Sequence, residues 1–264
     1  MEDTFSKKLH QKLPYDCTAF DGRDRGMTDG TGPLSGLLAD TGDDTFRVPL
    51  RASPVVLGAR VADLCMPAFP PAHRAPDLVD LARFDPALAL DIRYATARNF
   101  LGFPVYPSAR AFLQRPAAIA LSQARERAAQ HGCGLLVYDA YRPWHVSALF
   151  RHAVPDSLHD FVGDPAQGSR HNRGCAVDLT LWDLATRRVV PMPSGFDEMT
   201  ARAHTGYAGG TVQARKMRDL LSSIMQASGF LALAEEWWHF DFRDWQDYPV
   251  MDLSFDAIGT GLMP

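Results

Sequence analysis

The sequence has few cysteines, and none of them stand at the spacing of a metal or redox motif. The four are Cys17, Cys65, Cys133 and Cys175, and no two form a C-x-x-C pair. This spacing excludes a zinc ribbon and a thioredoxin-like site, and it gives no disulfide framework. We therefore expect isolated thiols in a reducing compartment.

Long apolar runs and basic clusters are also missing. No stretch approaches the roughly 20 apolar residues of a bilayer-spanning helix, and the first residues lack the basic-then-apolar layout of a secretory signal. We expect a cytoplasmic protein with no membrane partner, or a periplasmic one if the natural chain starts elsewhere than at Met1. With a net charge of −4 and dispersed lysine and arginine, no nucleic-acid partner is expected. The sequence leaves open whether the chain forms homo-oligomers.

The chain is nonetheless rich enough in apolar residues for a core. Of its 264 residues, 46% are hydrophobic and 22% charged, as in soluble globular proteins. Its beginning is different, because residues 1–50 are rich in Gly, Asp and Thr without periodicity, and a proline-rich stretch follows at 66–71. We predict an N-terminal extension over residues 1–76, partly loop or disordered, and one compact domain over residues 77–264.

Within this domain, helix and strand patterns alternate. Alternating or short buried apolar runs predict strands at residues 89–94, 135–138, 175–182, 188–190 and 237–242. Helices are predicted from Pro116 to a cap at Gly132, onward from Pro143, and through Met217 and Met225 to Gly229. The hairpin-like spacing of the C-terminal half favours an α+β fold with a mostly antiparallel central sheet flanked by helices.

Two short strings, residues 169–178 and 236–239, carry metal-ligating side chains. His171, Asp178 and His239 offer two imidazoles and a carboxylate, and Glu236 is a spare carboxylate. Catalytic zinc sites use three protein ligands, an open position for water and a general base beside it. The strings therefore predict a catalytic site with one Zn²⁺ per chain, although His/Asp sites also accept neighbouring divalent ions.

Strand alternation sharpens this prediction. Asp178 shares a face with Gly174 and Ala176, whose small size leaves room for an ion, whereas Cys175 points the other way as a core thiol. A regular strand would place Glu236 on the face opposite His239, so we predict a bend before Trp237. Taken alone, a histidine between aromatics such as His239 is more often a core residue than a ligand, and the pairing with the string at 171–178 reverses this preference. The alternative for Glu236 is a surface carboxylate where a strand begins.

A third string, Tyr138–Pro143, stands where a strand ends and a helix begins. An arginine there, Arg142, can donate hydrogen bonds to the oxyanion that develops at a scissile carbonyl. The alternative is a structural pair with Asp139 at a loop.

These strings, together with Asp91–Thr96 and Asn99–Phe100, resemble the D-alanyl-D-alanine dipeptidases of vancomycin-resistance type. That family lies within the zinc D,D-peptidase and Hedgehog-like group. The resemblance runs from about Leu78 to Phe242. The metal strings are shared with the wider group of zinc D,D-carboxypeptidases, whereas the strings at 138–143 and 236–239 are more particular to the dipeptidases.

The resemblance implies a Hedgehog/D,D-peptidase-like fold and hydrolysis of the small dipeptide D-Ala-D-Ala to two D-alanines. The roles it implies are zinc ligation by His171, Asp178 and His239, general base catalysis by Glu236, oxyanion stabilisation by Arg142, a pocket-lining role for Ser169, capture of the free amine by Asp197, and support of the pocket or of Arg142 by Asp139. The extension at 1–76 has no counterpart in the compact family domain.

Two alternatives stay open. The first is a D,D-carboxypeptidase that trims longer peptidoglycan stem peptides, since the metal chemistry would be the same. The second is a zinc-containing module without catalysis, as in the Hedgehog signalling domain. Loss of the base or of the arginine would mark such a module, and the sequence keeps both Glu236 and Arg142.

Overall fold

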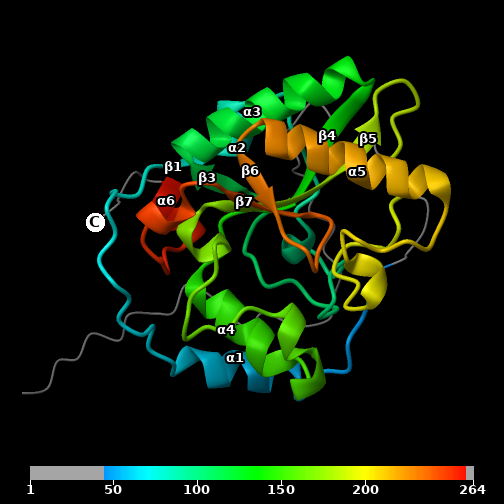
Figure 1. Cartoon of the computed structure of the whole chain (residues 1–264). Coiled ribbons are helices and arrows are strands. Elements are labelled where there is room, and N and C mark those ends of the chain that lie inside the picture. The colour runs from blue at the N-terminus through cyan, green and yellow to red at the C-terminus, as the bar shows by residue number, and fades with distance from the viewer. Residues whose placement is uncertain (1–44, 260–264) are drawn as a thin grey trace, which may run out of the picture.

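The computed structural model describes residues 45–259 (Figure 1). Its strands are β1 (Leu78–Asp80), β2 (Ala89–Leu90), β3 (Phe112–Gln114), β4 (Cys133–Asp139), β5 (Ala176–Asp183), β6 (Phe230–Ala232) and β7 (His239–Phe242). Its α-helices are α1 (Pro54–Ala62), α2 (Leu81–Phe84), α3 (Arg115–Gln130), α4 (Trp144–Ala153), α5 (Val212–Ala227) and α6 (Phe255–Gly259). Single turns of 3₁₀ helix include η2 (Arg93–Ala95), η3 (Asp156–Phe161), η4 (His171–Arg173), η5 (Ala201–Ala203) and η6 (Trp245–Asp247).

A five-stranded sheet forms the centre of the molecule, in the order β2-β4-β5-β7-β6. Only the β2–β4 pair is parallel, and the pairs β4–β5, β5–β7 and β6–β7 are antiparallel. Helices α3 and α5 pack against each other on one side of this sheet, while α4 lies on the other side with α1 against it (Figure 1). The expected α+β fold with a mostly antiparallel sheet is confirmed.

Both long helices end where the sequence predicted, and α3 also begins there, whereas α5 starts at Val212, ahead of the predicted apolar residues. Pro116 occupies the first turn of α3, where its missing N–H is not needed, and Gly132 beyond the helix adopts φ +72°. In α5, the Thr211 hydroxyl caps the first turn by accepting from the Ala214 amide over 3.0 Å. Gly229, at φ +92°, follows its C-terminus.

Two strand predictions were wrong in extent. The predicted strand 89–94 ends at Leu90, and the chain turns into η2, where the Arg93 guanidinium pairs with Asp91 over 2.9 Å. This turn directs the Tyr94 side chain into the core. The returning strand predicted at 188–190 is only an isolated bridge between Val189 and Trp182. Further along this edge of β5, the Leu179 amide instead donates to the Trp238 carbonyl over 3.1 Å, so the pairing is not extended.

The described part of the N-terminal extension is packed against the domain. Leu57 and Val61 of α1 are buried in the same core as the central sheet, and the Arg51 amide donates to Ala153 at the end of α4 over 2.9 Å. A domain boundary at Asp77 therefore remains a prediction. The structure shows that α1, on the N-terminal side of this boundary, packs against the domain. Residues 1–44, which carry most of the predicted irregular segment, lie outside the described residues.

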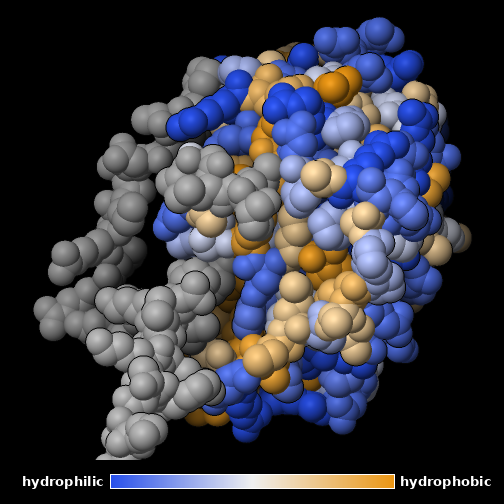
Figure 2. Space-filling model, turned by 90° about the vertical axis from the view of Figure 1, so that its left-hand side faces the viewer, coloured by the Kyte–Doolittle hydropathy of each residue, from blue (hydrophilic) through white to orange (hydrophobic). Residues whose placement is uncertain are grey.

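The outer surface is largely polar. On the face shown in Figure 2, hydrophilic residues predominate and hydrophobic ones form smaller areas between them. Within residues 45–259, no helix combines the length and the apolar character needed to cross a membrane.

Removing the side chain of Leu57 tests whether α1 belongs to the cooperative unit. Leu57 is fully buried, so we expect Leu57→Ala to lower the free energy of unfolding by about 2–5 kcal/mol. Its neighbour Val56 is 43% exposed, and Val56→Ala should change stability by less than about 0.5 kcal/mol. Urea unfolding of both variants is the measurement. If Leu57→Ala changed the free energy of unfolding as little as Val56→Ala does, α1 would unfold independently of the sheet.

Candidate metal centre

One row of residues across the central sheet carries three of the predicted site residues. Asp139 at the end of β4 lies opposite Asp178 of β5, and Asp178 lies opposite His239 at the start of β7. Residues that face each other across antiparallel strands point to the same side of the sheet, with Cβ atoms about 5 Å apart. The register therefore brings these side chains together. A register shift between Val137 and Asp139 ends the regular β4 pairing at this point.

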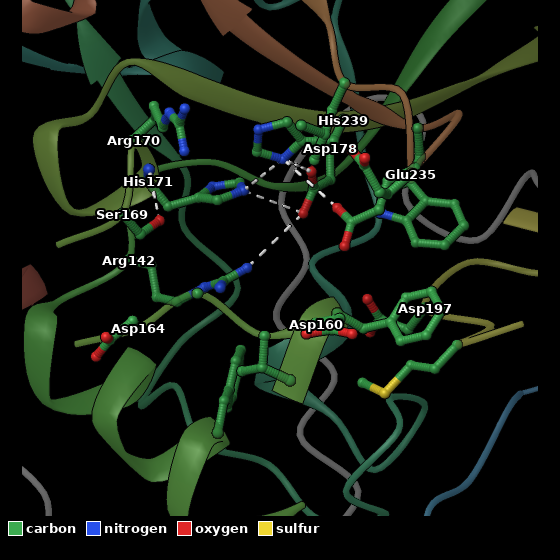
Figure 3. Close-up of a pocket in the computed structure, with 18 of the residues that line it drawn as sticks. Arg142, Asp160, Asp164, Ser169, Arg170, His171, Asp178, Asp197, Glu235 and His239 are labelled. Atoms are coloured by element: carbon green, nitrogen blue, oxygen red, sulfur yellow. Dashed lines mark hydrogen bonds and ion pairs between the residues drawn. The ribbon is translucent and has the colours of Figure 1, made fainter. Parts of the chain in front are cut away.

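The three predicted ligands converge (Figure 3). His239 Nδ1 lies 3.0 Å from Asp178 Oδ1 and 3.1 Å from His171 Nε2, and His171 Nε2 lies 3.4 Å from Asp178 Oδ2. All three residues are buried, and their ligand atoms lie within 4.8 Å of one another. Two imidazole nitrogens and one carboxylate around one point are a donor set that suits a single divalent ion.

A tight turn before β5 positions His171. It lies on η4, which Gly174 ends in the left-handed region at φ +64°. A side chain at Gly174 would also collide with Leu78, because a Cβ there would lie 2.4 Å from a Leu78 methyl carbon. The glycine at 174 thus has both a conformational and a steric reason.

Glu236 lies beside the ligand group, as the predicted bend required. The chain turns through Trp237 and Trp238, with the His239 amide donating to the Glu236 carbonyl over 3.3 Å. The Glu236 carboxylate lies 3.8 Å from His239 Nδ1 with its side chain only 18% exposed. Burial, reinforced by the nearby charge of Asp178, raises the pKa of Glu236 to about 7.

Arg142 approaches the centre from the start of α4. Its Nε and Nη2 donate to Asp139 Oδ2 over 3.0 and 2.7 Å, and Nη2 lies 3.8 Å from Asp178 Oδ2. The guanidinium also lies over the rings of Tyr94 and Phe150. Burial by itself would lower the pKa of Arg142, but the Asp139 charge raises it well above its ordinary value, so this side chain stays cationic.

Ser169 and Asp197 line the same cavity, which has a volume of about 260 Å³. The Ser169 hydroxyl accepts from the His171 amide over 3.0 Å. Asp197 is buried at a left-handed φ of +59°, and its Oδ2 accepts from the Tyr94 hydroxyl over 2.9 Å. Burial and the charge of Asp178 raise the pKa of Asp197 well above its ordinary value.

The charges around the cavity fit a bound cation. Asp178 is buried, and although burial alone would raise its pKa, His171 and His239 hold that pKa below its ordinary value. Arg142 is hydrogen-bonded to Asp139 and reaches Asp178 only through the longer contact of 3.8 Å, so the nearest partners of Asp178 are the two imidazoles. Because a buried carboxylate needs a positive partner, a divalent ion between these three side chains satisfies the site.

Comparison with known proteins agrees with this geometry. A family model described as D-ala-D-ala dipeptidase matches residues 74–257. The D-alanyl-D-alanine dipeptidase of Escherichia coli is 39% identical over 182 residues, which cover 69% of this chain and 93% of that protein. The chain belongs to the D-Ala-D-Ala dipeptidase family. The dipeptidase of Enterococcus faecium is 38% identical over 177 residues, covering 60% of this chain and 87% of the relative. The family resemblance inferred from the motifs is confirmed.

The structure adds residues to which the sequence assigned no role in this dipeptidase-family site. The Tyr94 and Tyr106 hydroxyls donate to the buried carboxylates Asp197 and Asp139, in the second case over 2.8 Å. The fully buried Asn172 donates to the Arg142 carbonyl over 2.8 Å and accepts from the Ser169 amide over 2.8 Å. Tyr94 belongs to a string that carried the resemblance, but nothing in the sequence pairs it with a carboxylate about a hundred residues later.

The raised pKa of Glu236 predicts a pH-dependent stability of the metal-free protein. A carboxyl whose folded-state pKa lies above its ordinary 4.5 keeps its proton longer in the folded state, so stability falls as pH rises from about 4.5 to about 7. Glu236→Gln removes this loss. Metal-free Glu236→Gln should therefore gain up to about 3 kcal/mol relative to wild type between pH 4.5 and 8.

Urea unfolding of the chelator-treated wild type and variant at both pH values measures this difference. A constant difference across the range would show that Glu236 titrates in the folded protein as it does in water.

Proposed function

We propose that the chain hydrolyses D-Ala-D-Ala to two D-alanines at a single zinc ion held by His171, Asp178 and His239. The observation that carries the proposal is the position of Glu236, a partly buried carboxylate 3.8 Å from a ligand nitrogen but outside the ligand group. A carboxylate with a pKa of about 7 in that place can both take and return a proton near neutral pH. The relatives are named for the same reaction.

Zinc, when bound, would supply a Lewis acid that polarises the peptide carbonyl and makes a water molecule easier to deprotonate. Glu236 accepts a proton from the attacking water while the water oxygen bonds to the carbonyl carbon. As the C–N bond breaks, the same carboxyl returns this proton to the leaving amine nitrogen. One group can serve both steps because, with a pKa of about 7, its protonated and ionised forms are both populated near neutral pH.

Arg142 is the proposed stabiliser of the oxyanion. Its hydrogen bonds to Asp139 use Nε and Nη2, so Nη1 takes part in neither. The Tyr94 and Phe150 rings and Asp139 hold the guanidinium in place before substrate arrives. A donor that is already oriented where negative charge develops lowers the barrier without reorganisation.

Asp197 and Ser169 are proposed to hold the dipeptide itself. A cavity of about 260 Å³ suits a small ligand, and the Asp197 carboxyl in its wall is buried. In the empty cavity the raised pKa of Asp197 favours its neutral form, and the ammonium group of a dipeptide would favour the ionised form. A longer peptide has no ammonium at that position, so this group favours the dipeptide.

The cytoplasm is the compartment we propose. Cys65, Cys133 and Cys175 are free thiols in the described part of the chain, which agrees with a reducing environment.

Replacing the proposed base separates metal binding from turnover. Glu236→Gln should keep about one zinc per chain and lose about 10²–10⁴-fold in kcat, because it removes proton transfer and leaves the ligands in place. The neighbouring Glu235→Gln changes an exposed side chain and should keep most of the activity. Zinc analysis and D-Ala-D-Ala hydrolysis before and after chelation are the measurements.

Near-native turnover of Glu236→Gln, or full activity of metal-free wild type, would end this mechanism. A zinc-loaded wild type that hydrolyses no peptide would instead point to a module without catalysis.

Substrate length and the free amine can be tested together. Wild type should prefer D-Ala-D-Ala over N-acetyl-D-Ala-D-Ala and over a tripeptide ending in D-Ala-D-Ala. Asp197→Asn should lower kcat/KM for the free dipeptide by roughly 30-fold or more, since it removes a buried partner of the ammonium. It should change the rate for the acetylated substrate little. A wild type that cleaves the tripeptide as well as the dipeptide would favour the D,D-carboxypeptidase reaction.

A further inference from the structure

The two histidines of the metal centre present different nitrogens to it. His171 turns Nε2 toward Asp178, and its Nδ1 lies 2.7 Å from the Ala140 carbonyl oxygen. His239 is reversed, because Nδ1 faces Asp178 and His171 while Nε2 lies 2.9 Å from Asp241 Oδ1. The outer nitrogen of His171 is thus hydrogen-bonded to a neutral carbonyl, with the Asp139 carboxylate further away at 3.7 Å, whereas that of His239 is hydrogen-bonded directly to a carboxylate.

The sheet register places Asp241 behind His239. Asp241 stands two residues further along β7 and so on the same face, opposite Ala176 of β5. The small Ala176 leaves the space that the carboxylate occupies. Asp241 is only 7% exposed, so its charge is largely withdrawn from water.

A second contact fixes the other oxygen of this carboxylate. Arg170 Nε lies 3.4 Å from Asp241 Oδ2, and the guanidinium lies over the Trp245 ring at 4.7 Å from its centre. Arg170 also lines the cavity next to the ligands and is drawn beside His171 and His239 in Figure 3. Asp241 is therefore held from two sides, by an imidazole and by a guanidinium.

We propose that Asp241 is a positioning residue that fixes the tautomer of His239, with the proton on Nε2 and the lone pair of Nδ1 directed to the metal, and that Arg170 holds Asp241 in this orientation. An acidic or carbonyl acceptor on the outer nitrogen of a ligating histidine sets both its tautomer and its ring orientation. Asp241 acts through His239 and touches neither the substrate nor the ion. This inference rests on the metal site of the proposed function and is independent of its substrate.

The difference between the two outer partners has a consequence. A carboxylate draws the Nε2 proton more strongly than a carbonyl does, which makes the Nδ1 lone pair of His239 a stronger donor. An asparagine at 241 can still accept the hydrogen bond, but it lacks the charge. The affinity for zinc should therefore decrease in the order wild type, Asp241→Asn, Asp241→Ala.

Nuclear magnetic resonance of the zinc-loaded wild type tests the tautomer directly. In ¹H–¹⁵N correlation spectra of histidine-labelled protein, His239 should carry its proton on Nε2 and His171 on Nδ1. Assignment comes from His239→Ala and His171→Ala spectra. A His239 ring protonated on Nδ1 would overturn the inference, whether or not any variant at 241 folds.

Zinc affinity, measured by competition with a chromophoric chelator, tests the energetic part. Asp241→Ala should bind zinc about 10–100-fold more weakly than wild type, with a smaller loss for Asp241→Asn. In the same variants the visible bands of the cobalt-substituted protein should persist with shifted positions, whereas loss of folding would abolish them. The matched control is Asp244→Asn, a carboxylate three residues further on whose side chain is 37% exposed and pairs with Arg74.

Zinc affinity of Asp241→Ala within twofold of wild type, or a loss no greater than that of Asp244→Asn, would overturn the inference. If wild type binds zinc but neither the His239 tautomer nor the zinc affinity of the Asp241 variants is as expected, the positioning role fails and the proposed function stands. If wild type binds no zinc, both fail.

Discussion

The structure depends on burying negative charge at one face of its central sheet. Asp139, Asp178 and Asp241 are each less than a tenth exposed, and they lie close together along neighbouring strands. Carboxylates in such a place stay ionised only if each has a positive or hydrogen-bonding partner. Arg142 is the partner of Asp139, and Arg170 and His239 contact Asp241. Asp178 lies against the two imidazoles and shares Arg142 with Asp139 through a longer contact of 3.8 Å. The burial that makes a further cation favourable beside Asp178 is thus also what gives this site its capacity for a metal ion.

The same constraint separates the roles of the remaining carboxylates. Asp178 faces two imidazoles, and its pKa is held low enough for a permanent ligand. Glu236 has one imidazole at 3.8 Å and Asp197 accepts from a neutral hydroxyl, and burial raises the pKa of each. In the mechanism we propose, the surroundings of each carboxyl group divide these groups between ligation, proton transfer and recognition of an ammonium group.

The scaffold supports this arrangement from below the cavity. Phe150 of α4 lies under the Arg142 guanidinium, with 4.6 Å between the guanidinium carbon and the ring centre. Helix α4 is in turn covered by α1, whose Leu57 is fully buried. The region N-terminal to the family domain is thus linked, through one helix, to the position of an arginine in the centre. The family model matches residues 74–257, so α1 lies N-terminal to the matched region.

The sequence by itself determined the chemistry of the centre and the main elements. His171, Asp178, His239 and Glu236 could be named because a donor set has a recognisable composition and spacing, and α3 and α5 because helix periodicity and caps are local signals. The bend at Glu236 followed from a conflict between strand alternation and the geometry that the chemistry requires.

Only the tertiary structure decided which residues stand behind the ligands. Tyr94 holding Asp197, and Asp241 behind His239, depend on strand register and on contacts between segments far apart in the chain. The short β2 and the missing strand at 188–190 had the same origin, because contacts with other residues outweighed a local apolar pattern: an ion pair of Asp91 in the first case, and the hydrogen bond from Leu179 to Trp238 in the second. Local patterns report which side chains can do chemistry, whereas the partners of those side chains are set by pairing across the sheet.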